Sequence, residues 1–262
     1  EVTVHDTLKM KEHLPLIREA GCRGLWMGVE DLTATLVKKG QNVDNTIEAF
    51  HRLREVGICP MPMMMHHDAQ TLYSQGSSYG LLNQVEILRR AGAVSLQVLM
   101  IVPSPGSTLY EETYTCGQVF ESAGGRRVEP YMHDGNYVIA SHHPHPWRKQ
   151  LNILSAYLYF YNPWWLLMSL LRNRQSKTRD RQLGMQIVGM LGVTQNLRRT
   201  LGWALRLKFG RKVRRTAPPA STIPLRHLRE ERSSSDLPLA TITMEGVQLG
   251  PRVAAPDAKA TG

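Results

Sequence analysis

Residues that could take part in chemistry follow each of three short apolar runs. The polar groups that end these runs are Glu30 and Asp31 after the first, His66 and His67 after the second, and the turn Pro103-Ser-Pro-Gly106 after the third. Carboxylates accept hydrogen bonds from hydroxyls and amines, imidazoles exchange protons near neutral pH, and glycine lets the backbone approach a ligand. The pattern indicates a ligand-binding rim.

The acidic pair follows a glycine, in the order Gly28-Val-Glu30-Asp31. Glycine allows close backbone approach, and Glu30 could accept a hydrogen bond from an amine or a ribose hydroxyl. The alternative is that Glu30 or Asp31 begins a helix, where a negative charge favours the helix dipole.

Histidines occur in two groups, His66-His67 and His142-His-Pro-His145. Neighbouring residues of a regular strand point to opposite faces, so His66 and His67 cannot bind the same metal ion. The second group lacks an acid or cysteine at ligand spacing. We therefore predict no metal site, and interpret His66, His67, His142 and His143 as the lining of a substrate pocket.

A repeat organises the first part of the chain. Gly21, Gly57 and Gly92 are spaced by 36 and 35 residues, and each follows a run with apolar residues at helical spacing. Glycine just past a helix is the usual left-handed cap. Strand candidates follow each glycine, at 25–29, 61–65 and 96–102. This alternation is typical of a parallel α/β sheet.

The number of units limits the architecture. A closed (β/α)₈ barrel needs eight units in about 250 residues, whereas three helix-strand units end here near residue 115, with Val2 to Val4 as a further strand candidate. We expect an α/β fold, a partial (β/α) barrel of parallel strands whose missing units lie upstream in a longer parent. A small open sheet is the alternative.

Beyond the repeat, turn residues gather between 116 and 147, and Asp134-Gly135 marks a weak hairpin or an irregular segment within 127–140.

The stretch 151–171 is apolar and uncharged, and its 21 residues match the length of a membrane span. Asn162-Pro163 breaks it, and it holds three tyrosines. Two helices against a core or in a membrane interface therefore explain it better.

Positive charge is concentrated near the end of the chain. Thirteen Lys or Arg and one acid lie between Arg172 and Thr216, which gives +12 against a total of +10. Helical apolar spacing over 182–209 predicts basic amphipathic helices suited to an anionic membrane surface. The alternative is a solvated face with non-specific nucleic-acid affinity only.

The expected organisation is a barrel part at 1–115, an α-helical extension at 116–175, basic helices at 176–215 and a disordered tail at 216–262.

The number and spacing of the cysteines indicate the redox environment of the protein. Cys22, Cys59 and Cys116 form a sparse, odd-numbered set, which argues against disulfides and for a reducing environment. No signal for secretion is present at the start of the sequence. We expect a cytoplasmic protein, peripheral at the inner face of the membrane.

The combined order of these motifs is more specific than any one of them. The segments Glu19 to Glu30, Gly57 to Asp68 and Val102 to Glu111 resemble the later strands of cobalamin-binding radical S-adenosylmethionine enzymes. Asp134-Gly-Asn-Tyr-Val, together with the stretch from His142 to Asn152 that leads into Tyr161-Asn-Pro, is similar to the hopanoid C-3 methylases. The resemblance covers roughly residues 1 to 175.

This resemblance implies a partial barrel whose strand ends surround S-adenosylmethionine. Gly28 and Glu30 match the family's Gly-x-Glu position near the cosubstrate, and Pro103, Pro105 and Gly106 match its last-strand turn. It also implies a 4Fe-4S cluster and cobalamin in the parent, and a polycyclic membrane lipid as substrate. Which residues would be catalytic is not implied.

The sequence departs from the family at one essential motif. The cluster motif CxxxCxxC is absent, and the three cysteines cannot supply three thiolates at that spacing. Formation of the adenosyl radical needs that cluster, so the chain alone is expected to be inactive. Our first hypothesis is a carboxyl-terminal fragment of a cobalamin-dependent radical methyltransferase. The alternative is a non-catalytic module that binds membrane surfaces, with no specific nucleic-acid partner.

Overall fold

The computed structural model of the protein describes residues 2–33, 42–107, 109–172 and 177–219, and the short segments 241–243 and 246–248. The chain divides into two units, residues 1–218 and 219–262. In the second unit, β8 (Thr241–Thr243) and β9 (Gly246–Gln248) pair in an antiparallel hairpin. The predicted disordered tail at 216–262 otherwise falls largely outside the described residues.

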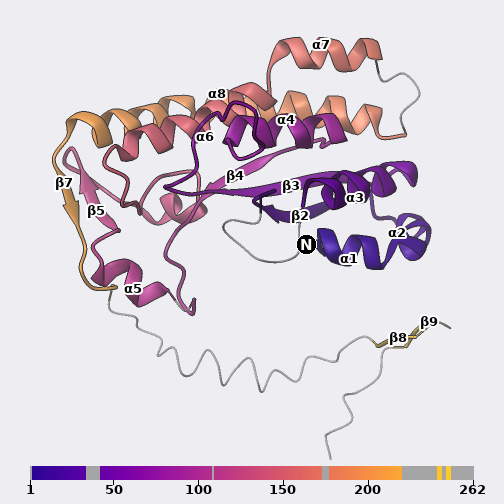
Figure 1. The fold of residues 1–262 in the computed structure, drawn as a ribbon, viewed down its shortest axis with the longest axis horizontal. Coiled ribbons are helices and arrows are strands. Elements are labelled where there is room, and N and C mark those ends of the chain that lie inside the picture. The colour runs from indigo at the N-terminus through magenta and orange to yellow at the C-terminus, as the bar shows by residue number, and fades with distance from the viewer. Residues whose placement is uncertain are drawn as a thin grey trace, which may run out of the picture. The chain divides into compact units, whose positions relative to one another are not determined.

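A parallel sheet forms the centre of the first unit. Its strands lie in the order β1 (Val2–Thr3), β2 (Gly24–Glu30), β3 (Cys59–His66) and β4 (Gln97–Met100), and every neighbouring pair is parallel (Figure 1). The prediction that the three repeated apolar runs are neighbouring strands of one direction is confirmed. So is the further strand at the start of the chain, whereas β4 is shorter than the predicted 96–102.

The helices between the strands end as the repeat predicts. The connecting helices are α1 (Val4–Lys9), η1 (Lys11–His13), α2 (Leu14–Glu19), α3 (Val43–Glu55) and α4 (Leu81–Ala91). Gly21, Gly57 and Gly92 have φ values of 105°, 81° and 101°. An L-residue with a side chain rarely adopts this left-handed conformation, so glycine is the residue that can end each helix there.

Helices cover one face of the sheet and leave the other partly open. Met27, Met64 and Val98 are fully buried in one apolar cluster with side chains of α3 and α4. On the other face Trp26 is 40% exposed, and Met61, like Met63 and Met65, is only partly buried. The residues of β3 thus alternate between a helix-covered face and a half-exposed face rich in methionine, as the period of two in a strand requires.

The outer edge of β4 is closed by hydroxyl groups of α6 (Pro146–Phe160) and of Tyr161, the residue that follows it. The Tyr161 hydroxyl accepts from Leu96 N at 2.7 Å and donates to Leu96 O at 3.1 Å. The Tyr157 hydroxyl bonds Val98 N and O, both at 3.1 Å. These groups occupy the positions that another strand would use, so the sheet can extend only beside β1. The described strands form an open parallel sheet, which confirms the α/β class and leaves the barrel as a proposal.

The extension after β4 differs from the prediction at its hairpin. It contains α5 (Tyr110–Thr115), β5 (Phe120–Ala123), β6 (Arg126–Arg127), η2 (Pro130–Asp134), α6, α7 (Pro163–Arg172), α8 (Arg179–Phe209) and β7 (Lys212–Arg214). The hairpin turns at Gly124-Gly125, between β5 and β6, and β7 pairs with the other edge of β5. Two alternatives were predicted for 127–140, an irregular segment or a weak hairpin around Asp134-Gly135. The hairpin is wrong, because η2 occupies that segment and Gly135 ends it in the left-handed conformation.

The apolar stretch 151–171 lies in two helices, α6 and α7, separated at Asn162-Pro163 as predicted. The Asn162 side chain bridges the break, since it donates to Tyr159 O at 2.7 Å and accepts from Trp165 N at 3.1 Å. In Figure 1, α8 runs alongside α6, and α7 lies on the outer side of α8. Among the described residues, none of the helices combines the length and apolar character that a membrane crossing needs.

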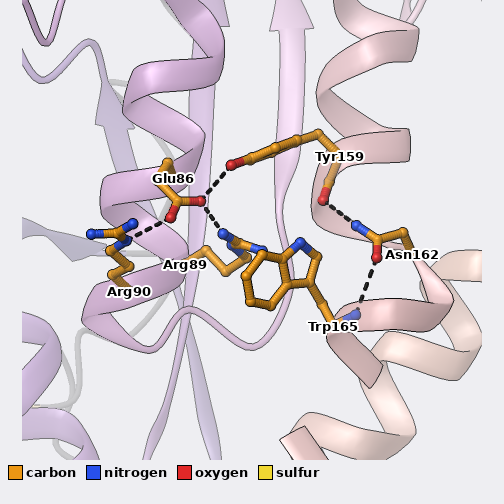
Figure 2. Close-up of polar contacts among 6 residues, drawn as sticks. All are labelled: Glu86, Arg89, Arg90, Tyr159, Asn162 and Trp165. Carbon is orange, nitrogen blue, oxygen red and sulfur yellow. Dashed lines mark hydrogen bonds and ion pairs between the residues drawn. The ribbon is translucent and has the colours of Figure 1, made fainter. Parts of the chain in front are cut away.

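One polar cluster fastens the start of α7 to α4 (Figure 2). Glu86 of α4 accepts a hydrogen bond from Tyr159 at 2.6 Å and pairs with Arg89 and Arg90. The Arg89 guanidinium lies over the Trp165 ring, 3.3 Å from its centroid, and near the Tyr159 ring. Stacking of a guanidinium on aromatic faces adds a cation–π contribution to the ion pair.

Candidate functional site

The carboxyl ends of β2 and β3 lie side by side and carry the predicted polar groups. β2 ends at Glu30, directly before Asp31, and β3 ends at His66, directly before His67 and Asp68. Because parallel strands end at the same edge of a sheet, the topology brings these residues to one rim, where α/β folds hold their ligands.

His66 is the buried centre of this rim. It is fully buried, its Nδ1 lies 2.7 Å from Gln70 Oε1, and its Nε2 lies 3.2 Å from Asn152 Nδ2. The amide oxygen can only accept and the amide nitrogen can only donate, so the proton belongs on Nδ1. Burial lowers the pKa of His66 to about 4. His66 is therefore neutral at pH 7, and both ring nitrogens are engaged within the fold.

His67 presents a nitrogen to the interior instead. Its Nε2 is buried and has no hydrogen-bond partner among the residues that the structure describes, and its ring contacts Tyr79 edge-on with centroids 6.2 Å apart. Burial lowers the pKa of His67, while the nearby Asp31 carboxylate opposes this shift. An unpaired buried nitrogen is costly, so His67 is the histidine of this pair that is best suited to bind a ligand.

Asp68 joins the two histidine motifs that lie far apart in sequence. Its Oδ1 accepts from Ser141 Oγ at 2.6 Å, and its Oδ2 accepts from His142 N at 2.6 Å. Ser141 Oγ in turn accepts from His143 N at 3.0 Å. The predicted pocket residues at 142 and 143 are thus held beside the end of β3 through one carboxylate.

The loop that carries this second histidine motif is also fixed from β7. Arg214 Nη1 donates to Gly117 O at 2.7 Å, to Gln118 O at 3.0 Å and to Ser141 O at 2.9 Å. Hydrogen bonds from a charged donor are stronger than those between neutral groups. A residue near the end of the first unit in sequence therefore positions the rim.

Lys149 is a functional candidate that the sequence did not reveal. Its side chain belongs to α6, the residue is 4% exposed, and Nζ donates to Gln70 O at 2.6 Å. Burial lowers the pKa of Lys149, and the Asp68 carboxylate opposes this shift. Burial lowers the pKa of His143, and the charge of Lys149 lowers it further. A buried cation with one hydrogen-bond partner in the described part of the chain can attract an anionic or carbonyl oxygen.

Asp31 is a second carboxylate of the rim, and unlike the partly buried Asp68 it is buried. It is 2% exposed, and it accepts from Gln84 Nε2 at 2.6 Å and from Thr33 Oγ1 at 2.8 Å. Gln84 Oε1 also accepts from Leu32 N at 3.2 Å, so α4 holds the chain just after β2. The alternative that Asp31 begins a helix concerns residues 34–41, which lie outside the described residues.

Glu30 has the most unusual backbone of the rim. Its φ is 55°, and it is the one described non-glycine residue with a positive φ. The β2–β3 register shifts at this point, where Gly28 stands opposite Met63 and Glu30 opposite Met64. Such strain costs about 1–3 kcal/mol and clusters at functional sites.

The predicted turn after β4 lies on the same side of the sheet but has few contacts. Pro103 is buried, whereas Pro105 and Gly106 are exposed, and Gly106 has a φ of 85°. Ser107 N closes the turn on Ser104 O at 3.1 Å. The following helix α5 begins after Leu109.

No part of the rim resembles a metal centre. The described residues contain no group of three or more His, Cys, Asp or Glu side chains placed to hold a metal ion. Cys22 and Cys59 lie near the amino ends of β2 and β3, and Cys116 follows α5. The rim instead combines imidazoles, two hydrogen-bonded carboxylates and a buried ammonium, a set suited to binding a polar ligand. The sequence matches no protein-family model and no curated protein.

Proposed function

We propose that the chain is the carboxyl-terminal part of a cobalamin-dependent radical S-adenosylmethionine methyltransferase that acts on a polycyclic membrane lipid. The observation that carries the proposal is the half-exposed face of the sheet. Helices bury most of one face of β2, β3 and β4, while Trp26, Met61 and Met63 on the other face stay partly open. Apolar residues on such a face are typical of the interior of a larger curved sheet.

The two edges of the sheet support the same reading. The tyrosine hydroxyls of Tyr157 and Tyr161 occupy the outer edge of β4, which suits the last strand of a barrel. Further strands would add beside β1, the edge that comes first in sequence. In this proposal the face lined by Met61 closes around the ligand once those strands are present.

The strained Glu30 is the proposed contact to the cosubstrate. Its carboxylate lies at the end of β2, two residues after Gly28, and could accept hydrogen bonds from the ribose hydroxyls or the amino group of S-adenosylmethionine. The turn with Pro103, Pro105 and Gly106 would border the same nucleoside. Lys149 and His67 would face the lipid or the cosubstrate's carboxylate.

The residues present do not fit a 4Fe-4S cluster. Three thiolates at one place are needed, but Cys59 is buried at the amino end of β3, and Cys22 and Cys116 belong to other segments. In the proposed parent, S-adenosylmethionine would supply the adenosyl group and cobalamin the methyl group. The cluster and cobalamin ligands would lie outside this chain, whose own part is to bind cosubstrate and substrate. We therefore expect the chain alone to have no methyltransferase activity.

Equilibrium dialysis of the chain with labelled S-adenosylmethionine tests this proposal. We expect saturable binding that weakens by about tenfold or more in Glu30→Gln, because a hydrogen bond to a carboxylate contributes about 1.5–3 kcal/mol. Glu48→Gln is the matched control, since Glu48 lies on α3 and is half exposed. Absence of saturable binding, or equal binding by Glu30→Gln and wild type, would overturn the proposal.

A second function, docking to an anionic membrane surface without catalysis, is favoured by one observation. Large apolar side chains are exposed on α7 and α8, with Trp164 61%, Val188 61% and Phe209 75% exposed, while α8 also carries exposed arginines such as Arg198. Apolar area combined with positive charge is what holds a helix at a membrane interface. Flotation with anionic vesicles at low and high salt tests it, and absence of binding at low salt would eliminate it.

A further inference from the structure

A pocket of about 420 Å³ lies between α6 and α8, on the side of the fold where α6 covers the edge of β4. Its inner end reaches Leu96, and the segment 131–137 borders its other end. The volume falls within the range of about 300–1,000 Å³ that is usual for small-molecule sites. None of the rim residues around His66 or Glu30 lines it, so the pocket is a separate feature of the molecule.

The lining changes from apolar to polar along the pocket. At the inner end, Leu96, Ile153 and Tyr161 are 4%, 2% and 8% exposed. At the other end, Tyr131 is 44% exposed, and Arg199 of α8 is exposed as well. A ligand that fits this gradient is amphipathic, with its apolar part inside and its polar group at the surface.

The polar atoms of the inner end are already in use. The hydroxyls of Tyr157 and Tyr161 bond the backbone of β4. Gln150, which contacts the segment 131–137 at the other end, is also engaged, since it accepts from Val138 N at 2.9 Å and donates to Asn136 O at 2.9 Å. The inner end therefore offers ring faces and aliphatic carbons, which favours a hydrocarbon over a polar group.

At the outer end, a cation and a phenol remain available. Arg199 makes no hydrogen bond or ion pair with the described part of the chain. Tyr137 lines the pocket, is 4% exposed, and its hydroxyl has no hydrogen-bond partner there either. Asp134, the acid nearby, already accepts from Asn136 N at 2.8 Å and from Asn136 Nδ2 at 2.9 Å. A guanidinium and a hydroxyl donor together suit a carboxylate head group.

We propose that this pocket binds a single-chain aliphatic carboxylate of the fatty-acid type. The hydrocarbon chain of this ligand lies between α6 and α8 against the ring of Tyr161, and its carboxylate contacts Arg199 and Tyr137. This site goes beyond the proposed methyltransferase function and does not depend on it, because it shares no residue with the strand-end rim.

The glycines of α8 form the wall opposite Tyr161 and supply a direct test. A Cβ at Gly189 would lie 2.2 Å from the Tyr161 ring, whereas a Cβ at Gly192 would meet no atom within 4 Å. Gly192 lines the pocket, so a large side chain there fills the space without a clash of its first atom. Gly184 also lies on α8 with no atom within 4 Å of a Cβ, but it does not line the pocket.

Isothermal titration calorimetry of the full chain with sodium decanoate, below its micelle concentration, measures the binding. We expect one site per chain, weakened at least about tenfold by Gly192→Phe, because the ring displaces the hydrocarbon chain, a loss of at least about 1.4 kcal/mol. Gly184→Phe should bind as wild type does. Thermal unfolding of both variants verifies that each is folded.

The head group is tested on two neighbouring arginines of α8. Arg199→Gln should weaken decanoate binding by about fivefold, about 1 kcal/mol for a charged contact near solvent. Arg198→Gln, which removes the same charge outside the pocket, should leave it unchanged. Decan-1-ol should bind to wild type more weakly than decanoate does. To Arg199→Gln the two ligands should bind with equal affinity.

Three results would overturn this proposal. They are no saturable decanoate binding, equal binding by Gly192→Phe and wild type, and a decyltrimethylammonium affinity that matches that of decanoate. The S-adenosylmethionine dialysis experiment, repeated on Gly192→Phe, separates the two proposals, because filling the pocket should leave that binding unchanged.

Discussion

Substitution of Tyr161 by Phe tests whether hydroxyl groups close the sheet. The change keeps the ring, which packs against Gly189, and removes only the oxygen that bonds Leu96 N at 2.7 Å and Leu96 O at 3.1 Å. Leu96 is 4% exposed, so water cannot readily replace the lost partner. Each buried backbone group left without a partner costs about 1–3 kcal/mol, and two such groups lower the free energy of unfolding by about 2–4 kcal/mol, allowing for partial relaxation.

Urea unfolding followed by circular dichroism measures this loss. In a domain of this size each kcal/mol corresponds to a change in melting temperature of about 2–4 °C, so thermal unfolding should shift downward by roughly 4–16 °C. Amide hydrogen exchange adds a local readout, since the Leu96 N–H should lose its protection in the variant.

Tyr73→Phe is the matched control. Tyr73 is 63% exposed, and its hydroxyl makes no hydrogen bond with the described residues, so its loss should stay within about 0.5 kcal/mol. If Tyr161→Phe also changes stability by less than about 0.5 kcal/mol and the Leu96 amide keeps its protection, then the tyrosine does not close the edge of β4 and our reasoning on the sheet is wrong.

Three further predictions concern other parts of the fold. The His66 pKa of about 4 lies below its ordinary value of 6.5, so the unfolded chain takes up a proton first. His66 therefore stabilises the fold above pH 6.5 by up to about 3 kcal/mol, and this contribution is lost as the pH falls from 6.5 to about 4. Urea unfolding at pH 7 and pH 5 measures this loss: the difference in the free energy of unfolding between the two pH values should be smaller in His66→Gln than in the exposed control His51→Gln. On α8, Gly184→Ala and Gly192→Ala should each raise the free energy of unfolding by about 0.5–1 kcal/mol through helix propensity. Gly189→Ala should lower it by about 1–3 kcal/mol because the Tyr161 ring must move, and equal melting temperatures for all three variants would contradict this. Arg89→Met should free the start of α7 from α4, so that limited proteolysis cuts near Trp165 faster, whereas Arg52→Met, which removes only exposed ion pairs, should leave that cleavage rate unchanged.

The parts of the fold that local sequence encodes were predictable. Helical spacing before Gly21, Gly57 and Gly92 predicted the three helix ends, since a positive φ is a local requirement that glycine satisfies. The break at Asn162-Pro163 was equally local. The apolar runs that follow these glycines predicted neighbouring parallel strands.

The features that sequence reasoning missed depend on distant contacts. The hairpin turn at Gly124-Gly125 is an exception, because Gly-Gly is itself a local turn signal. The pairing of β5 with β7, a strand about ninety residues later, is a distant contact that no local pattern reveals. The link between Asp68 and Ser141 is also non-local. Lys149 was missed because lysine is rarely buried. Only the fold shows that its ammonium donates a hydrogen bond to Gln70 O.

The alternation of methionines along β3 gives the sheet an uneven sensitivity to oxidants. Met61, Met63 and Met65 line the half-exposed face, whereas Met64 is enclosed beneath the helices. Thioether side chains adapt their shape to irregular apolar partners, but conversion to sulfoxides makes them polar. Peroxide would therefore reach this face first and convert an adaptable lining into one that repels hydrocarbon, while the enclosed sulfur keeps the strand in place.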